Sequence, residues 1–119
     1  MNEQKIEEGR AYWCAINYQA KKRKGKSNLH LGIIVRIFEG VEYNNYLVAG
    51  ITTSYDNLDL KDIEYTKIYY KNKESIVKHH ELHCLSDNRI KRFAFKLGDD
   101  QFKNLKKKIV KWIQEDAKK

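Results

Sequence analysis

Proline is absent from this chain of 119 residues, and glycine, cysteine and methionine are scarce, with six, two and one copies respectively. Without proline, the glycines must supply most of the sharp turns. Two cysteines are too few for the disulfide framework of a small secreted domain. No apolar run reaches the roughly 18 residues that a membrane span requires, and the first residues, MNEQK, lack an apolar signal-peptide core. We therefore expect a cytoplasmic protein with reduced thiols and no membrane segment.

Positive charge is in excess, because 24 lysines and arginines stand against 16 aspartates and glutamates, for a formal net charge of +8. Such a surface attracts polyanions through steering and counterion release, although an acidic protein partner would suit it equally well. Hydrophobic residues make up 41% of the chain and aromatic residues 12%, which is too much for a disordered protein. The length fits one domain, so we expect a single domain over residues 1–119, with a flexible N-terminal segment at residues 1–8.

Apolar and β-branched segments recur along most of the chain and predict strands. Residues 31–38 form a continuous apolar run, LGIIVRIF, which predicts a central strand buried on both faces. Further strands are predicted at residues 11–16, 46–53, 62–70, 75–78 and 92–95, with a helical or irregular turn at 79–82.

The C-terminal segment predicts a helix. Gly98 and Asp99 supply a stop and an N-cap. Lysines cover one side of this segment, and apolar residues recur with helical spacing on the other. The apolar residues are Phe102, Leu105, Ile109, Trp112 and Ile113. Several short strands followed by one terminal helix predict a mainly β fold, a small and strongly bent sheet or barrel packed by an amphipathic helix.

Five cations fall within six residues around Gly25, and they are Lys21, Lys22, Arg23, Lys24 and Lys26. A solvated surface loop accounts for such a run. Alternatively, the loop clamps phosphates and supplies affinity for RNA without reading its sequence. Tyr12 and Tyr18, which precede the loop, could stack on unpaired bases.

A second polar cluster contains His79, His80, His83 and Cys84. His79 and His83 could share one face of a helix and bind zinc. A structural zinc site needs four ligands, however, and the sequence has no CxxC motif, so we expect neither a metal nor another cofactor. Acid–base catalysis and an ordinary exposed turn both remain open for these histidines.

Three hydroxyl side chains, Thr52, Thr53 and Ser54, follow the apolar run at 46–51. They could cap the strand end through local hydrogen bonds. They could equally hold a phosphate group at the mouth of the strand.

In their order, these segments resemble the MazF/PemK family, the ribonuclease toxins of bacterial toxin–antitoxin pairs. Four segments before the closing helix carry the resemblance, namely GRAYWCAIN at 9–17, HLGIIV at 30–35, VAGITT at 48–53 and ELHCLSDNRI at 81–90. Each motif is short, so the resemblance depends on the order of all the segments from about Gly9 to Trp112. The resemblance implies an SH3-like barrel, a homodimer, metal-independent cleavage of single-stranded RNA, and an acidic antitoxin peptide or protein as partner.

The sequence departs from this family at the residues that would carry catalysis. The family's arginine before the aliphatic strand falls on His30, its later arginine on His83 and its aspartate on Ser86, whereas its threonine is kept as Thr52. RNA cleavage by 2′-hydroxyl attack needs a base, an acid and a donor to the phosphate. Two histidines and a threonine could fill these roles.

The resulting hypothesis is a toxin-type endoribonuclease in which His30 and His83 act as acid and base and Thr52 contacts the phosphate. Its RNA contacts would be the cations at 21–26, Thr53 and Arg89. Two other functions stay open. One is a nucleic-acid-binding module that does not cleave, and the other is a protein-interaction barrel that receives an acidic peptide.

Overall fold

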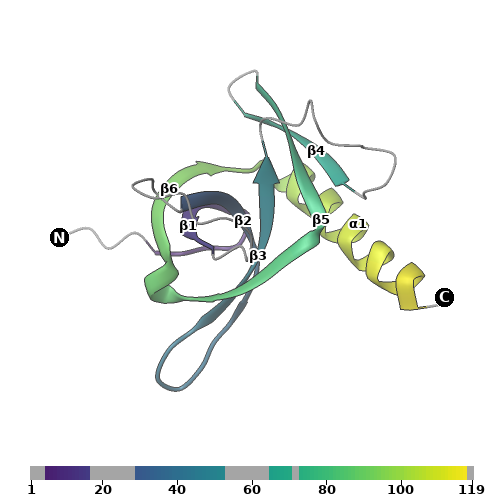
Figure 1. Ribbon diagram of the computed structural model, residues 1–119. Coiled ribbons are helices and arrows are strands. Elements are labelled where there is room, and N and C mark those ends of the chain that lie inside the picture. The colour runs from purple at the N-terminus through teal and green to yellow at the C-terminus, as the bar shows by residue number, and fades with distance from the viewer. Residues whose placement is uncertain (1–4, 17–28, 53–64, 71–72, 118–119) are drawn as a thin grey trace, which may run out of the picture.

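The computed structural model describes residues 5–16, 29–52, 65–70 and 73–117 (Figure 1). These residues form one antiparallel sheet and a C-terminal helix, so the predicted mainly β fold with a terminal helix is confirmed. The elements are β1 (Arg10–Ala15), β2 (Leu29–Phe38), β3 (Asn45–Thr52), β4 (Tyr65–Tyr70), β5 (Lys73–Ser86), the 3₁₀ turn η1 (Asp87–Arg89), β6 (Ile90–Lys96) and α1 (Asp99–Ala117).

The sheet is strongly bent, with the strand order β4-β5-β3-β2-β1-β6. The long strand β5 pairs with β4 through its first part and with β3 through much of its length. As a result, β6, β1, β2, β3 and the end of β5 curve around a common interior (Figure 1). Within the described residues β4 and β6 lie at opposite ends of the strand order and do not pair, so the sheet is open and a closed barrel is not confirmed.

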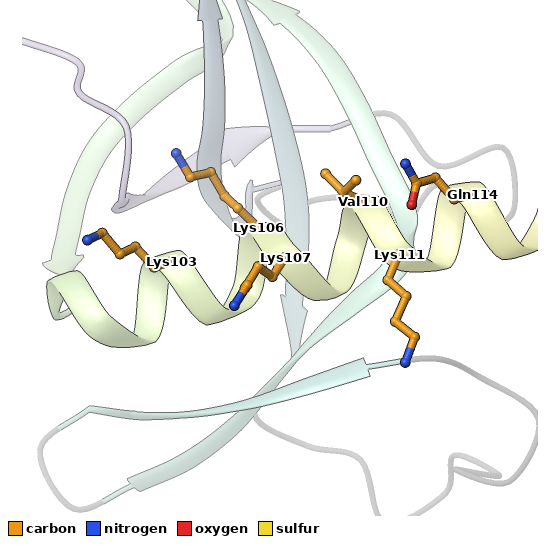
Figure 2. A pocket seen from close by; sticks show the side chains of 6 residues that line it. All are labelled: Lys103, Lys106, Lys107, Val110, Lys111 and Gln114. Carbon is orange, nitrogen blue, oxygen red and sulfur yellow. The ribbon is translucent and has the colours of Figure 1, made fainter.

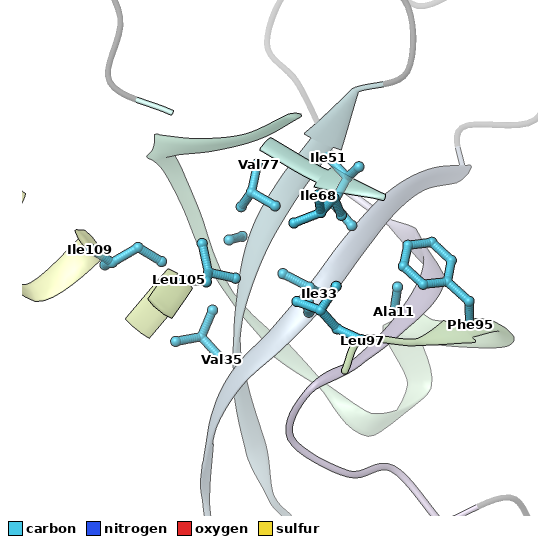
Figure 3. Close-up of a cluster of buried hydrophobic side chains, with 11 residues drawn as sticks. Ala11, Ile33, Val35, Ile51, Ile68, Val77, Phe95, Leu97, Leu105 and Ile109 are labelled. Carbon is cyan, nitrogen blue, oxygen red and sulfur yellow. The ribbon is translucent and has the colours of Figure 1, made fainter. Parts of the chain in front are cut away.

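Two clusters of buried side chains lie on the two faces of the sheet. The first lies beneath α1 and includes Ile33, Val35, Leu105 and Ile109 (Figure 3). Side chains alternate between the faces of a strand, so Ile34 points to the opposite, interior face. There it joins the second cluster, whose other members include Tyr12, Cys14, Tyr46, Val48 and Leu85. The central strand β2 is therefore buried on both faces at residues 32–35, whereas Phe38 at its end, which the apolar run places in the same buried strand, is 47% exposed.

Helix α1 begins at Asp99, where the sequence predicts it. Leu105 and Ile109 are buried against the sheet, and Trp112 is half-buried. Ile113 is 48% exposed, so the buried stripe is narrower than predicted. In the part of the chain that the structure describes, no helix is long and apolar enough to cross a membrane.

Of the helical turn and the irregular segment expected at residues 79–82, the helical turn is wrong, because these residues belong to β5. Their irregularity is a shift in strand register. From Ala49 to Ile51 β3 advances by two residues, whereas β5 covers five residues, from Leu82 to Val77. A bulge of this kind redirects the side chains around it. The strand predicted at 75–78 is correspondingly too short.

The bulge also separates two of the histidines that the sequence placed on one helical face. His79 is buried on the α1 side of the sheet, where its Nε2 atom lies 2.7 Å from the hydroxyl oxygen of Thr66. Its ring centroid lies 6.4 Å from that of Trp112. His83 lies on the interior face, opposite Val48 of the second cluster. The expected shared face of His79 and His83 is therefore wrong.

The described part of the N-terminal segment, which the sequence placed in a flexible region, contacts the sheet. The Tyr12 hydroxyl donates to the carbonyl oxygen of Lys5 (3.3 Å) and accepts from the backbone N–H of Glu7 (3.2 Å). The backbone N–H of Ile37 donates to a carboxylate oxygen of Glu8 at 3.1 Å. These hydrogen bonds hold the segment against β1 and β2.

Candidate functional site

Two glycines face each other on neighbouring strands and make room on the interior face of the sheet. Gly32 of β2 pairs with Gly50 of β3, and both are buried. A Cβ atom on Gly50 would lie 3.1 Å from a carboxylate oxygen of Glu81, and one on Gly32 would collide with Cγ1 of Val48. The missing side chain at Gly50 therefore lets the Glu81 carboxylate rest directly on the sheet.

The three predicted catalytic residues lie on this interior face. His30 and Thr52 each lie two residues beyond the glycine pair, on β2 and β3 respectively, and a spacing of two keeps a side chain on the same face. His83 lies opposite Val48, which precedes Gly50 by two residues on β3. The structure thus brings His30, Thr52 and His83 to the same side of the sheet as Glu81.

Four charged or titratable side chains interact on this face, and we call them the His30 cluster: His30, Lys78, Glu81 and His83. Lys78 forms an ion pair with Glu81, and both side chains are only 17% exposed. Partial desolvation lowers the pKa of His30 below its ordinary value of 6.5. The Glu81 carboxylate acts in the opposite direction, and the positive charges of Lys78 and His83 lower the pKa further. The strand register agrees with this, because Glu81 lies against Gly50, whose cross-strand partner Gly32 is two residues from His30.

The cluster combines features suited to proton transfer. A histidine whose pKa lies below 6.5 is mostly neutral at pH 7, and a neutral imidazole has one nitrogen that can accept a proton. The side chain of His30 is exposed, whereas His83 is half-buried and its Nε2 atom is enclosed by protein. A bound molecule could therefore reach His30 from solvent, whereas it could use only the other ring nitrogen of His83, Nδ1.

The sequence reasoning missed Lys78 and Glu81. Glu81 and His83 are two residues apart, and this spacing would place them on one face of a strand. This spacing did not indicate a shared face in the sequence, because the segment was expected to be a helical turn or irregular and not a strand. Lys78 and Glu81 are three residues apart, and in a regular strand this spacing would place them on opposite faces. Lys78 reaches Glu81 because the bulge in β5 lies between them.

Arg89, a predicted RNA contact, is fixed at the end of β1. Its Nη1 atom donates to the carbonyl oxygen of Ala15 at 3.2 Å. Cys14, the residue before Ala15, is the cross-strand partner of His30. The hydrogen bond therefore holds Arg89 against the part of β1 that borders His30. Arg89 also lines an open groove of about 610 Å³ with Tyr43, Asn45, Cys84, Leu85, Ser86, Asp87 and Asn88.

The other predicted RNA contacts, Lys21, Lys22, Arg23, Lys24, Lys26 and Thr53, lie outside the described residues. In the second polar cluster predicted from the sequence, His80 and Cys84 are exposed on β5. No group of three or more histidine, cysteine, aspartate or glutamate side chains that could hold a metal ion occurs among residues 5–16, 29–52, 65–70 and 73–117.

A scan against models of known protein families gave no match, and a search of curated proteins gave none either. The functional assignment therefore depends on the chemistry and placement of the residues themselves.

Proposed function

We propose that this protein is a metal-independent endoribonuclease of the MazF/PemK-like toxin type, which cleaves single-stranded RNA. The observation that supports the proposal is the placement of His30, His83 and Thr52 on one sheet face, with His30 and His83 coupled through their charges. The excess of positive charge supports a polyanionic substrate.

In the proposed reaction His30 acts as the general base, because its lowered pKa leaves it neutral at pH 7. It takes the proton of a 2′-hydroxyl, whose oxygen then attacks the adjacent phosphorus atom. The bond from phosphorus to the 5′-oxygen breaks, and protonated His83 supplies a proton to that oxygen from its Nδ1 atom, because Nε2 is enclosed by protein. The products are a 2′,3′-cyclic phosphate and a 5′-hydroxyl, and exchange with water restores both histidines.

The remaining groups hold the phosphate and position the base. The Thr52 hydroxyl donates to a phosphate oxygen, and such a donor is most valuable where negative charge develops in the transition state. The carboxylate of Glu81, bound to Lys78 and resting on Gly50, favours the protonated form of His30 that the reaction generates.

RNA on either side of the cleaved phosphate would contact basic and aromatic residues. Arg89 and the groove beside it would receive one flank, and Tyr43, which is 59% exposed there, could stack on a base. The cations at 21–26 and Thr53 would contact further phosphates. As in the family that the sequence resembles, the proposal includes a homodimer, an acidic antitoxin as partner, and a cytoplasmic location.

The test uses end-labelled single-stranded RNA of mixed sequence and protein treated with excess chelator. We expect cleavage that leaves cyclic-phosphate ends. His30→Gln and His83→Gln should each slow cleavage by about 10²-fold or more, with RNA affinity close to wild type. Thr52→Val should weaken the hold on phosphate. His80→Gln is the matched control, since His80 is an exposed histidine on the same strand outside the His30 cluster, and it should leave the rate unchanged.

A different outcome would favour a module that binds RNA without cleaving it. Wild-type protein would then bind RNA, with an affinity that falls steeply with salt, and would cut none of the substrates. In that case the replacement of the family's arginines by His30 and His83 marks lost chemistry.

A further inference from the structure

Helix α1 carries a basic surface on the side that faces away from the sheet (Figure 2). An open hollow of about 620 Å³ runs along it. Four of the described residues that line it are lysines and none is acidic, and the full set is Lys103, Lys106, Lys107, Val110, Lys111 and Gln114. We call these six residues the lysine face.

The lysine face has an apolar centre. Val110 is 51% exposed and shares a row with Lys103 and Gln114, because spacings of seven and eleven residues return to the same side of a helix. Lysines lie on both sides of this row, for example Lys106 on one and Lys111 on the other (Figure 2). The aliphatic stems of such lysines cover apolar surface while their ammonium groups stay in water. The face therefore offers an apolar strip between two positively charged borders.

We propose that the lysine face binds an acidic amphipathic helix of a partner protein. Apolar side chains of that helix would pack on Val110, and its carboxylates would pair with the bordering lysines, which is the helix-in-groove mode of recognition. From Lys103 to Gln114 the hollow spans twelve residues, or about 16 Å, so about three turns of a partner helix fit it. The interaction is independent of RNA cleavage, because α1 covers the face of the sheet opposite the His30 cluster.

The lysines are available for such pairing. Lys111 lies 3.9 Å from Glu115, and both side chains are well exposed, so this contact is weak and can be exchanged. Lys106 lies with its Nζ atom 4.8 Å from the ring centroid of Phe102. The ammonium group of Lys106 is thereby positioned at one border of the face.

Other partners match the lysine face less well. RNA would use the ammonium groups, but it would leave Val110 unused and would find no aromatic side chain among the described lining residues on which to stack. A second copy of the chain that packs through the same face would set four lysines against four, which is repulsive. A membrane surface calls for a wide apolar face, whereas Leu105 and Ile109 are buried against the sheet.

The experiment measures fluorescence anisotropy of a labelled synthetic peptide of about 18 residues, long enough to form a helix on binding. Its leucines lie on one helical side and its glutamates on the other. We expect saturable binding to the full chain. A peptide of identical composition with its leucines scattered around the helix should bind about tenfold more weakly or worse. Equal binding of the two peptides would overturn the proposal, since only total charge would then matter.

Variants of the exposed residues identify the site. Replacing Lys103, Lys107 and Lys111 together by glutamine should weaken peptide binding about tenfold, at a factor of about two for each exposed ion pair. Val110→Ser should weaken it about threefold through lost apolar burial. Lys108→Gln is the matched control, because Lys108 is exposed on the same helix but does not line the hollow. Circular dichroism should show unchanged folding for every variant.

Three results would overturn the assignment. One is an unchanged affinity in Val110→Ser, and another is an equal loss in Lys108→Gln and Lys107→Gln. The third is displacement of the peptide by single-stranded RNA or by phosphatidylserine vesicles at lower concentrations than by unlabelled peptide. Displacement by RNA would identify the lysine face as a nucleic-acid surface, and displacement by vesicles would identify it as a membrane-binding surface.

Discussion

Replacing Leu105 by alanine perturbs the contact that holds α1 on the sheet. Leu105 is fully buried in the first cluster, together with Ile33, Val35 and Ile109 (Figure 3). The substitution removes three carbon atoms, and at about 0.8 kcal/mol for each the lost burial costs about 2.4 kcal/mol. A cavity that stays open raises the cost, so the expected loss in the free energy of unfolding is about 2–5 kcal/mol.

The corresponding change in melting temperature follows from the size of the chain. An unfolding entropy of about 2.1 cal/mol/K per residue gives about 0.25 kcal/mol/K for 119 residues. Each kcal/mol therefore lowers the Tm by about 4 °C, and Leu105→Ala should lower it by about 8–20 °C in a calorimetric or circular-dichroism melt.

Val110→Ala is the matched control, because Val110 lies in the same helix but is 51% exposed. Its cost should stay below about 0.5 kcal/mol, or about 2 °C. Equal shifts for the two variants, or a shift under about 4 °C for Leu105→Ala, would refute the packing of α1 on the first cluster.

The pKa of His30, the reactivity of the two cysteines and the close packing at Gly32 can each be tested. In an NMR titration His30 should titrate below its ordinary pKa of 6.5, and Glu81→Gln should lower that pKa further by removing the opposing charge. Because the unfolded chain binds this proton at a higher pH, the His30 contribution to stability should fall as the pH drops below 6.5. A His30 pKa at or above 6.5 would contradict the geometry of the cluster. Burial raises the pKa of the Cys14 thiol to about 12, so a thiol reagent should label exposed Cys84 in the native protein and Cys14 only after unfolding. Gly32→Ala should cost about 1–3 kcal/mol in urea denaturation, because its Cβ would collide with a buried valine, and an unchanged midpoint would argue against this close packing.

Elements with a regular apolar period could be predicted from the sequence. The run at 31–38 predicts a strand buried on both faces, and β2 is buried in this way at residues 32–35. The spacing of Leu105 and Ile109 predicts the buried side of α1, which begins where Gly98 and Asp99 place it. In both cases the signal is local, since a strand or helix repeats its burial within a few residues.

Strand β5 could not be predicted in the same way. Its segment KHHELHC has no apolar alternation, and whether it turns or extends depends on pairing with β3 and β4, which are distant in sequence. The bulge opposite Gly50 is a property of that pairing. Tertiary contacts here outweigh the local pattern.

The residues of the candidate site also fall into two groups, those that the sequence indicates and those that depend on tertiary contacts. His30, Thr52 and His83 could be named because the order of segments resembles a known family. Glu81 is two residues from His83, but this spacing indicates a shared face only in a strand, and its place on the sheet also depends on the missing Cβ of Gly50 on another strand. Lys78 enters the site through its ion pair with Glu81, so it too depends on a contact that the sequence does not express.

The pH dependence of RNA cleavage is the measurement that most directly tests a pair of catalytic histidines. Single-turnover rates on labelled single-stranded RNA, with chelator present, should follow a bell-shaped curve. We expect its acidic limb below pH 6.5, where His30 becomes protonated, and we expect His30→Gln to remove that limb together with about 10²-fold of the rate. A protein that binds RNA yet cuts none of it at any pH, or a curve that His30→Gln leaves unchanged, would contradict the proposed function.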